Sequence, residues 1–382
     1  MLRPNIFVAT LGILAVATGS ALAQGTLYEL VPDASASSSF GWQISVSGDQ
    51  AIVADPGADA AYVFERTGGA GNPWAQVAKL TSSDASTSFA FAVAIDGDWA
   101  LVTDRDRGYL YAYEKPVGGW ADATEDQNTY NGEAWGYRIA LDGTQMAWTR
   151  RGAGGEVWTH DGANWIYGDG GVNPGGALSA PGKANSFGEN VDIDGDLVVI
   201  GDFLRGGNGG AYIYQKSPDW GTTSTPDRII DGAGAEWLGI DVAADNGSLL
   251  LGAYHNNTDQ GAAYIYDDWS TSATADTTLL GDGSAEYFGV AVDLDGSLAV
   301  VGTRADKFYV FEKTGGAWSQ WDVVSDPMGS SHSFSEPLAL SGAFAAIGSP
   351  GNGKAYLYEV PEPSSFALFL VGMGLMILWR YR

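Results

Sequence analysis

The chain has no cysteine and only three histidines among its 382 residues. Disulfides and thiolate metal sites are therefore excluded, and His160, His255 and His332 lie too far apart in sequence to predict a zinc cluster. Basic residues are scarce as well, because 19 Lys and Arg stand against 46 Asp and Glu and give a formal net charge of -27. Since nucleic-acid binding needs a basic surface, we expect no nucleic-acid partner.

Motifs of common catalytic sites are also missing. The sequence contains no H-E-x-x-H motif, no Gly-rich phosphate loop and no Ser-His-Asp arrangement that can be ordered along the chain. An enzyme needs a positioned base, nucleophile or metal, so we expect a protein that is not an enzyme. One alternative stays open, because two carboxylates facing each other across a channel would suit a glycan hydrolase or lyase.

Long apolar runs occur only at the two ends of the chain. Residues 1–23 combine an early arginine, an apolar run over 6–19 and the small-residue site Ala21-Leu22-Ala23. This pattern predicts a secretory signal peptide that is cleaved before Gln24. The apolar run is shorter than the roughly 20 residues that a membrane-spanning helix needs.

The other end, residues 360–382, has three parts. Pro361, Glu362 and Pro363 come first, an apolar stretch over 365–379 follows, and Arg380-Tyr381-Arg382 closes the chain. This tail resembles the PEP-CTERM sorting signal of Gram-negative bacteria. The resemblance implies export, transient membrane insertion through the C-terminal segment and recognition by an exosortase-type protease. The protein would then reach the cell envelope, the cell surface or the medium, often together with exopolysaccharide.

The body of the chain, residues 24–359, is one unit repeated seven times. Each unit begins with a motif such as "SFGWQISVSGDQAIVADP" and recurs after about 50 residues. The seven motifs begin at Ser39, Ser88, Ala134, Ser186, Trp237, Tyr287 and Ser333. Two short apolar strands around a turn, a Tyr-rich strand and a more polar fourth strand make up a unit, which is typical of a propeller blade.

The last unit ends at "AYLYEV" without a fourth strand. Residues 27–34, "LYELVPDA", match the fourth strands of other units, such as the one that begins at Trp74. A strand from the N-terminus would complete the final blade and remove the open edges of the ring. The expected fold is therefore all-β: a seven-bladed β-propeller of four-stranded antiparallel blades, closed by an N-terminal strand.

The repeat is similar to the FG-GAP repeat of the integrin α-subunit head. Phe40-Gly41, Phe187-Gly188 and Phe288-Gly289 carry its first element, and Leu251-Gly252-Ala253 comes closest to its second. The resemblance implies a seven-bladed propeller, and members of this family often carry calcium loops between the first two strands.

Recurring Asp-Gly pairs between those two strands allow two interpretations. Asp-Gly between alternating apolar strands is a preferred hairpin turn, and these loops are too short to supply the six to eight oxygens of a calcium site. We therefore expect turns and no cofactor. The densest carboxylate set, Asp192, Asp194 and Asp196, is the one place where a calcium ion is still considered.

Strand order predicts which face of the disc binds a ligand. Both hairpin turns of each unit fall on one face, so the opposite face carries the varied loops that follow the second strand and those that enter each Phe-Gly. Solvated loop charge is one interpretation of these loops, and a rim for an acidic glycan or an acidic protein loop is the other. The candidate residues on this face are Asp55, Arg105, Arg150, Asp202, Tyr254, His255 and Arg304.

Together, these observations predict an exported binding or scaffold protein of the cell surface or extracellular matrix. Exopolysaccharide and envelope proteins are the expected partners. A calcium-dependent adhesin remains a further alternative.

Overall fold

The computed structural model describes residues 25–69, 71–84, 88–130, 136–167, 176–221, 225–272, 274–284, 286–329 and 334–361. The signal peptide, Glu362, Pro363 and the apolar tail lie outside the described residues, as do His332 and the first residues of the third and seventh units, Ala134 and Ser333. No helix in the described part has the length and apolar character needed to cross a membrane.

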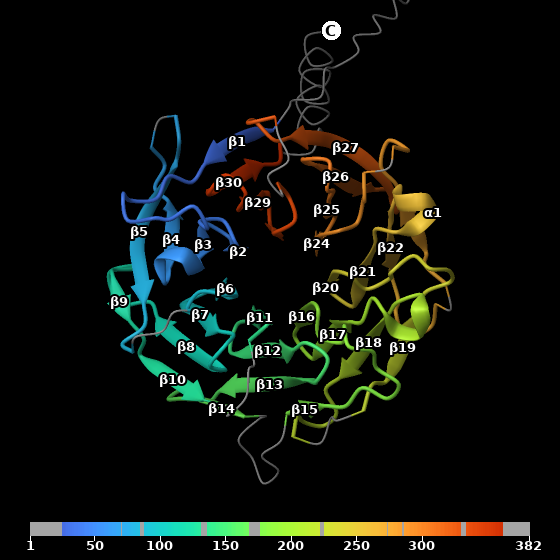
Figure 1. Cartoon of the computed structure of the whole chain (residues 1–382), viewed down its shortest axis with the longest axis horizontal. Coiled ribbons are helices and arrows are strands. Elements are labelled where there is room, and N and C mark those ends of the chain that lie inside the picture. The colour runs from blue at the N-terminus through green and yellow to red at the C-terminus, as the bar shows by residue number, and fades with distance from the viewer. Residues whose placement is uncertain are drawn as a thin grey trace, which may run out of the picture. The chain divides into compact units, whose positions relative to one another are not determined.

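Seven sheets stand around a central channel and form a β-propeller (Figure 1). Five sheets have four strands and two have five, and the predicted all-β fold is confirmed. We number the blades 1 to 7 by their inner strands. These are β2 (Ile44–Ser47), β6 (Val93–Asp96), β11 (Arg138–Asp142), β16 (Val191–Asp194), β20 (Val242–Asp245), β24 (Val292–Asp295) and β28 (Leu338–Ser341).

Each inner strand pairs antiparallel with a second strand, which pairs with a third. The second strands are β3 (Gln50–Asp55), β7 (Trp99–Asp104), β12 (Gln145–Arg150), β17 (Leu197–Gly201), β21 (Ser248–Ala253), β25 (Leu298–Gly302) and β29 (Phe344–Ser349). The third strands are β4 (Ala60–Arg66), β8 (Tyr109–Glu114), β13 (Gly154–His160), β18 (Gly210–Gln215), β22 (Ala262–Tyr266), β26 (Lys307–Thr314) and β30 (Lys354–Glu359).

Outer strands complete the blades. They are β5 (Trp74–Thr81), β10 (Gln127–Tyr130), β14 (Trp165–Tyr167), β19 (Arg228–Asp231), β23 (Thr277–Leu279), β27 (Ala317–Ser325) and β1 (Thr26–Glu29). Two extra strands, β9 (Ala123–Thr124) and β15 (Ala177–Leu178), pair with β5 and β13. One short helix, α1 (Asn256–Asp259), and two single 3-10 turns, Pro56–Ala58 and Arg205–Gly207, lie in loops that follow second strands.

The ring closes as predicted, through β1. This strand pairs antiparallel with β30 from Thr26 opposite Glu359 to Glu29 opposite Tyr356. In Figure 1 the first and last strands of the chain lie side by side. Leu30, which follows β1, is buried in the core between blades 7 and 1. The seventh blade therefore contains both ends of the folded chain.

The core consists of seven apolar layers, each between two neighbouring blades. Between blades 1 and 2, for example, Ile52 and Val63 pack against Phe89, Val102 and Tyr111. Strands that are apolar on both sides follow from this arrangement, because each face of a middle strand contacts another blade. All seven layers lie within residues 26–360, which form one compact unit. That segment therefore contains the packing that it needs to fold.

Candidate binding face and central channel

The strand directions give the disc two different faces. In blades 1 to 6 the first hairpin turn and the connection from the third to the outer strand lie together, and in blade 7 the first hairpin turn lies with the end of β30. We call this side the Asp-Gly face. The other side, the Phe-Gly face, carries the loops after the second strands and the loops that enter each inner strand. This division is the one that the strand order predicted.

On the Asp-Gly face, the turn residue of each blade is bonded to the turn of the next. The carboxylate of Asp96 accepts the backbone N–H of Gly143 at 2.7 Å, and Asp142 accepts that of Gly195 at 2.6 Å. The same link recurs around the ring, and it includes Asp194 with the amides of Asn246 and Gly247, Asp245 with Gly296, Asp295 with Gly342, Ser341 Oγ with Gly48, and Ser47 Oγ with Asp96. The turns are thus confirmed, and their side chains join neighbouring blades.

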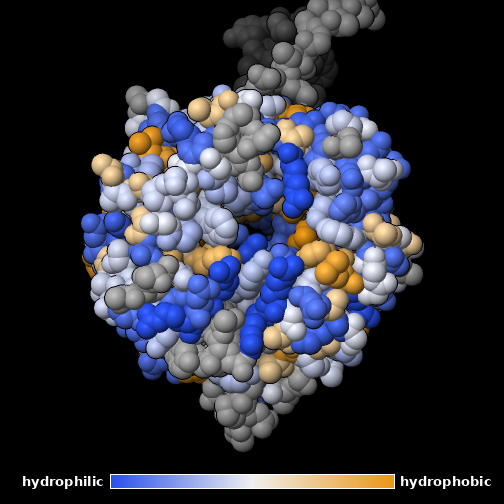
Figure 2. Space-filling model, viewed as in Figure 1, coloured by the Kyte–Doolittle hydropathy of each residue, from blue (hydrophilic) through white to orange (hydrophobic). Residues whose placement is uncertain are grey.

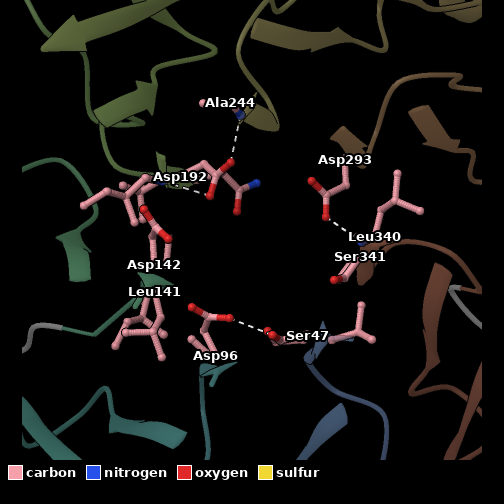
Figure 3. A pocket seen from close by; sticks show the side chains of 18 of the residues that line it. Ser47, Asp96, Leu141, Asp142, Asp192, Ala244, Asp293, Leu340 and Ser341 are labelled. Carbon is pink, nitrogen blue, oxygen red and sulfur yellow. Dashed lines mark hydrogen bonds between the residues drawn. The ribbon is translucent and has the colours of Figure 1, made fainter. Parts of the chain in front are cut away.

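A cavity of about 320 Å³ lies inside this ring of turns and is lined by the inner strands. The side chains of Asp96, Asp142, Asp192 and Asp293 lie around this cavity (Figure 3). Asp192 and Asp293 each accept a backbone N–H from the next blade, from Ala244 at 2.8 Å and from Leu340 at 2.6 Å.

Three carboxyls of the channel, those of Asp192, Asp241 and Asp293, are half-buried in the ring of inner strands. Desolvation raises the pKa of Asp241 to about 7, although the N–H groups of Val292 and Val242 favour its charged form. Desolvation also raises the pKa of Asp192 and that of Asp293, and the negative charge of Asp192 raises the pKa of Asp293 further. The channel therefore holds carboxyls that resist ionisation more than exposed ones do.

The calcium candidates are not brought together. Asp192 and Asp194 face the channel from β16, but each accepts backbone amides of blade 5, and Asp196 lies exposed in the turn. In the part of the chain that is described, no three His, Cys, Asp or Glu side chains are grouped so that they could hold a metal ion.

The Phe-Gly face has a second cavity of about 320 Å³ at the mouth of the channel. Figure 2 shows a hollow at the centre of the disc with strongly hydrophilic and hydrophobic residues at its edge. Most of the lining comes from one position of the repeat, the residue that follows Phe-Gly. Around the ring this position is Trp42, Phe91, Tyr137, Glu189, Ile240, Val290 and Glu336.

Blades 1 to 3 give this mouth a continuous aromatic edge. The ring centroids of Trp42 and Phe91 are 5.7 Å apart, and those of Phe91 and Tyr137 are also 5.7 Å apart. Trp42 has 40% of its surface exposed, while Phe91 is buried beneath the guanidinium of Arg105, which lies 4.2 Å from the ring centroid. Tryptophan side chains are mostly buried in folded proteins, so an exposed tryptophan beside a cavity marks a candidate contact for a ligand.

Arginines of this face pair with carboxylates. Arg304 lies 3.2 Å from Glu336 and Arg105 lies 3.0 Å from Asp106. Arg151 lies 2.7 Å from Glu189, which also accepts the hydroxyl of Tyr137 at 3.1 Å. The face is therefore polar and charge-balanced rather than basic.

The predicted ligand residues separate into two groups. Asp55 and Asp202 are fully buried, where they accept hydrogen bonds from the loops that enter blades 1 and 4, for example Ser37 N at 2.6 Å and Ala184 N at 2.7 Å. Both carboxylates therefore hold loops in place instead of lining the face. Arg105 stacks on Phe91, and Arg150 is half-buried at the end of β12.

Tyr254, His255 and Arg304 come together in a second aromatic group. Trp237 packs against Tyr254 and His255, with ring centroids 5.4 and 4.1 Å apart, and Arg304 lies 4.9 Å from the ring of Tyr254. His255 also pairs with Asp259. Trp237 has a positive φ of 58°, which strains a bulky residue, so the surrounding contacts hold it in place.

Sequence reasoning missed Trp42, Phe91 and Tyr137. The signal was present, because the same column of the aligned repeats reads Trp, Phe and Tyr in the first three units. A comparison of the seven repeats position by position would have predicted that these rings lie side by side at the channel mouth.

Comparisons with known proteins agree with this architecture and with the predicted tail. Residues 359–382 match the family of the PEP-CTERM protein-sorting motif, which marks an exported protein that an exosortase sorts. Such proteins usually occur in Gram-negative bacteria, anchored to the envelope or secreted from it. No curated protein matches the sequence.

Solved structures share the fold at very low sequence identity. The WD40 β-propeller domain of Doa1 is 10% identical with a TM-score of 0.60, covering 89% of this chain and 97% of that one. Raptor of Chaetomium thermophilum is 11% identical with a TM-score of 0.60, covering 89% and 29%. Sqt1 of Saccharomyces cerevisiae is 11% identical with a TM-score of 0.56, covering 85% and 97%. The chain is thus an exported β-propeller, and these similarities concern the fold alone.

Proposed function

We propose that this exported propeller is a non-catalytic binding or scaffold protein of the cell surface or extracellular matrix. Exopolysaccharide and envelope proteins are the proposed partners, and the Phe-Gly face is the binding face. The observation that carries the proposal is the cavity at the channel mouth, because it combines an exposed tryptophan with several polar side chains that are already oriented.

The place where the chain leaves the propeller supports this assignment. Strand β30 runs from the Phe-Gly face to the Asp-Gly face, where Glu359 pairs with Phe344 beside the turn at Gly342. Val360 N then donates to Ala343 O at 2.7 Å, and the sorting motif begins here. The last residue of the propeller therefore lies on the face opposite the Phe-Gly cavity.

The repeat pattern supports the proposal as well. We interpret the seven units as FG-GAP-like, because the turns at Gly41, Gly239 and Gly289 each pack on a glycine in the second strand of the preceding blade. A carboxylate pair for hydrolysis is a weaker proposal, since Asp192 and Asp293 already accept backbone N–H groups in the channel.

The test is binding of the processed domain, residues 24–360, to exopolysaccharide purified from the producing organism, with and without calcium. We expect saturable binding that weakens in the Arg105→Ala, Arg150→Ala, Arg304→Ala variant. Equal binding with calcium and with a chelator would speak against the calcium-dependent adhesin.

A charge-matched control removes three cations from the other face. Arg66, Lys115 and Lys313 lie at or next to the ends of third strands on the Asp-Gly face. If Arg66→Ala, Lys115→Ala, Lys313→Ala weakens binding as much as the first variant does, the Phe-Gly face is not the binding face. No binding of either exopolysaccharide or envelope proteins would overturn the proposed function.

A further inference from the structure

The Phe-Gly cavity has an apolar side and a polar side. Trp42 and Phe91 lie on the apolar side, and the backbone N–H of Trp42 is fixed by the carbonyls of Ser39 and Ala54 at 3.2 and 3.3 Å. The tryptophan is thus held at the edge of the cavity while a large part of its surface remains exposed. A flat ligand face that carries C–H groups would cover this ring.

On the polar side, donors and acceptors alternate. Arg138 donates to Asn190 Oδ1 at 2.9 Å, and Asn190 in turn donates to the carbonyl of Ile240 at 2.8 Å. Arg304 and Glu336 form the second pair that lines the cavity. Groups that are both donors and acceptors, such as hydroxyls, find partners of either kind at such an edge.

The charge of the lining argues against a charged ligand. The cavity is lined by two arginines and two glutamates, whose formal charges cancel: Arg138, Arg304, Glu189 and Glu336. The net charge of -27 on the whole chain further disfavours an anion. These observations depart from the acidic glycan that the loop arginines alone suggested, because two of those arginines, Arg105 and Arg304, each have a carboxylate partner.

We propose that the Phe-Gly cavity binds an uncharged sugar ring of a polysaccharide, with the C–H face of the ring on Trp42 and its hydroxyls on Arg304, Glu336 and Asn190. The volume of about 320 Å³ is at the small end for ligand sites and suits a single ring better than a long segment. This inference rests on the proposed function and names the ligand class of its face.

The experiment measures binding of the processed domain to soluble neutral polysaccharides (laminarin, dextran and galactomannan) by calorimetry and tryptophan fluorescence. We expect at least one of them to bind, with an affinity that changes less than twofold between 50 and 500 mM NaCl, because screening weakens only charged contacts. Trp42→Ala should weaken binding at least tenfold, and Trp42→Phe should retain part of it.

Two controls separate a site effect from a folding effect. Leu280→Ala removes another exposed apolar side chain, 57% exposed, and should leave affinity unchanged. All variants should melt within a few degrees of the parent protein. Failure of every neutral polysaccharide to bind a normally folded domain would overturn the inference, even if a charged polysaccharide such as alginate or chitosan binds.

A chemical comparison distinguishes this inference from the proposed function. The producing organism's exopolysaccharide is tested before and after reduction of its carboxyl groups to alcohols. Binding through Trp42 that survives reduction supports a neutral ring. Binding through the same residue that is lost on reduction would contradict the neutral ligand while leaving the proposed surface-binding function intact.

Discussion

At the residue scale, one glycine of the second strand explains how closely neighbouring blades approach. A Cβ atom on Gly252 would lie 2.1 Å from the carbonyl oxygen of Gly289, which belongs to the Phe-Gly turn of the next blade. Gly201, Gly302 and Gly348 meet the following turn in the same way. In blades 2 and 3 threonines occupy this position and donate to the turn instead, as Thr149 Oγ1 does to the carbonyl of Gly188 at 2.9 Å.

Gly252→Ala should therefore destabilise the propeller. The added methyl group meets backbone, which cannot move without shifting blade 6, so we expect a loss of about 1–3 kcal/mol in the free energy of unfolding. Chemical denaturation measures the loss. Gly234→Ala is the matched control, because a Cβ there meets nothing within 4 Å, and equal losses for the two variants would contradict the steric explanation.

The aspartate of the hairpin turn has a role that turn chemistry alone does not require. Gly97 supplies the positive φ of the turn, 55°. Asp96 accepts hydrogen bonds from blades 1 and 3 through its two carboxylate oxygens. Ser47 Oγ donates to one oxygen at 2.6 Å and Gly143 N donates to the other at 2.7 Å. The recurrence of aspartate at this position thus follows from contacts between blades.

Asp96→Ala should lower the free energy of unfolding by about 1–2 kcal/mol, because two hydrogen bonds between blades are lost. Asp98→Ala removes an equal charge from the same turn, where the side chain is exposed, and should have little effect. Urea denaturation of both variants provides the test. A larger loss for Asp98→Ala than for Asp96→Ala would refute the proposed link between blades.

At the element scale, the strands that are buried on both sides are the ones that the sequence predicted best. The first three strands of each blade are packed on both sides, so their apolar runs were readable in every unit. The outer strands β10 and β14 were missed, since "QNTY" over Gln127–Tyr130 is polar and Trp165–Tyr167 is only three residues long. Pairing with the preceding third strand specifies them, and such pairing leaves little mark on the sequence.

The N-terminal strand β1 was found because it repeats the pattern of an outer strand. Deleting residues 26–31 should lower the free energy of unfolding by roughly 3–5 kcal/mol, because Leu30 is removed from the core and four pairs of strand residues are lost. The exposed edge of β30 should also make the shortened protein associate. Differential scanning calorimetry and light scattering measure the two effects.

A synthetic peptide of residues 26–31 gives the control for this deletion. Added in excess, it should restore part of the lost melting temperature and reduce association, because it can pair with the open edge. An unchanged melting temperature after the deletion, with or without peptide, would show that β1 does not stabilise the ring.

For the whole molecule, the period of the repeat was enough to predict seven blades, their closure and the two faces. The chemistry of the candidate binding face was predicted only in part, because it depends on contacts between blades. Arg304 of blade 6 pairs with Glu336 of blade 7, and Arg151 of blade 3 pairs with Glu189 of blade 4. A linear sequence displays the arginines but not their partners, so the face seemed more basic than it is.

The channel predicts how stability depends on pH. Asp192, Asp241 and Asp293 have a raised pKa in the folded state, whereas an unfolded chain titrates near ~3.9. Between these values the folded state binds more protons, so the free energy of unfolding falls as pH rises from about 4 to about 7. Above the folded-state pKa of Asp241 its contribution no longer changes with pH.

Asp241→Asn should flatten this dependence, because an amide accepts the N–H of Val292 without carrying a charge. We expect the fall in melting temperature between pH 5 and pH 8 to be smaller in the variant than in the parent protein. Asp98→Asn removes the same charge from the exposed turn and should leave the fall nearly unchanged, which separates the channel from the general effect of net charge. An identical pH dependence in Asp241→Asn and the parent would mean that water reaches the channel carboxyls as freely as it reaches the surface.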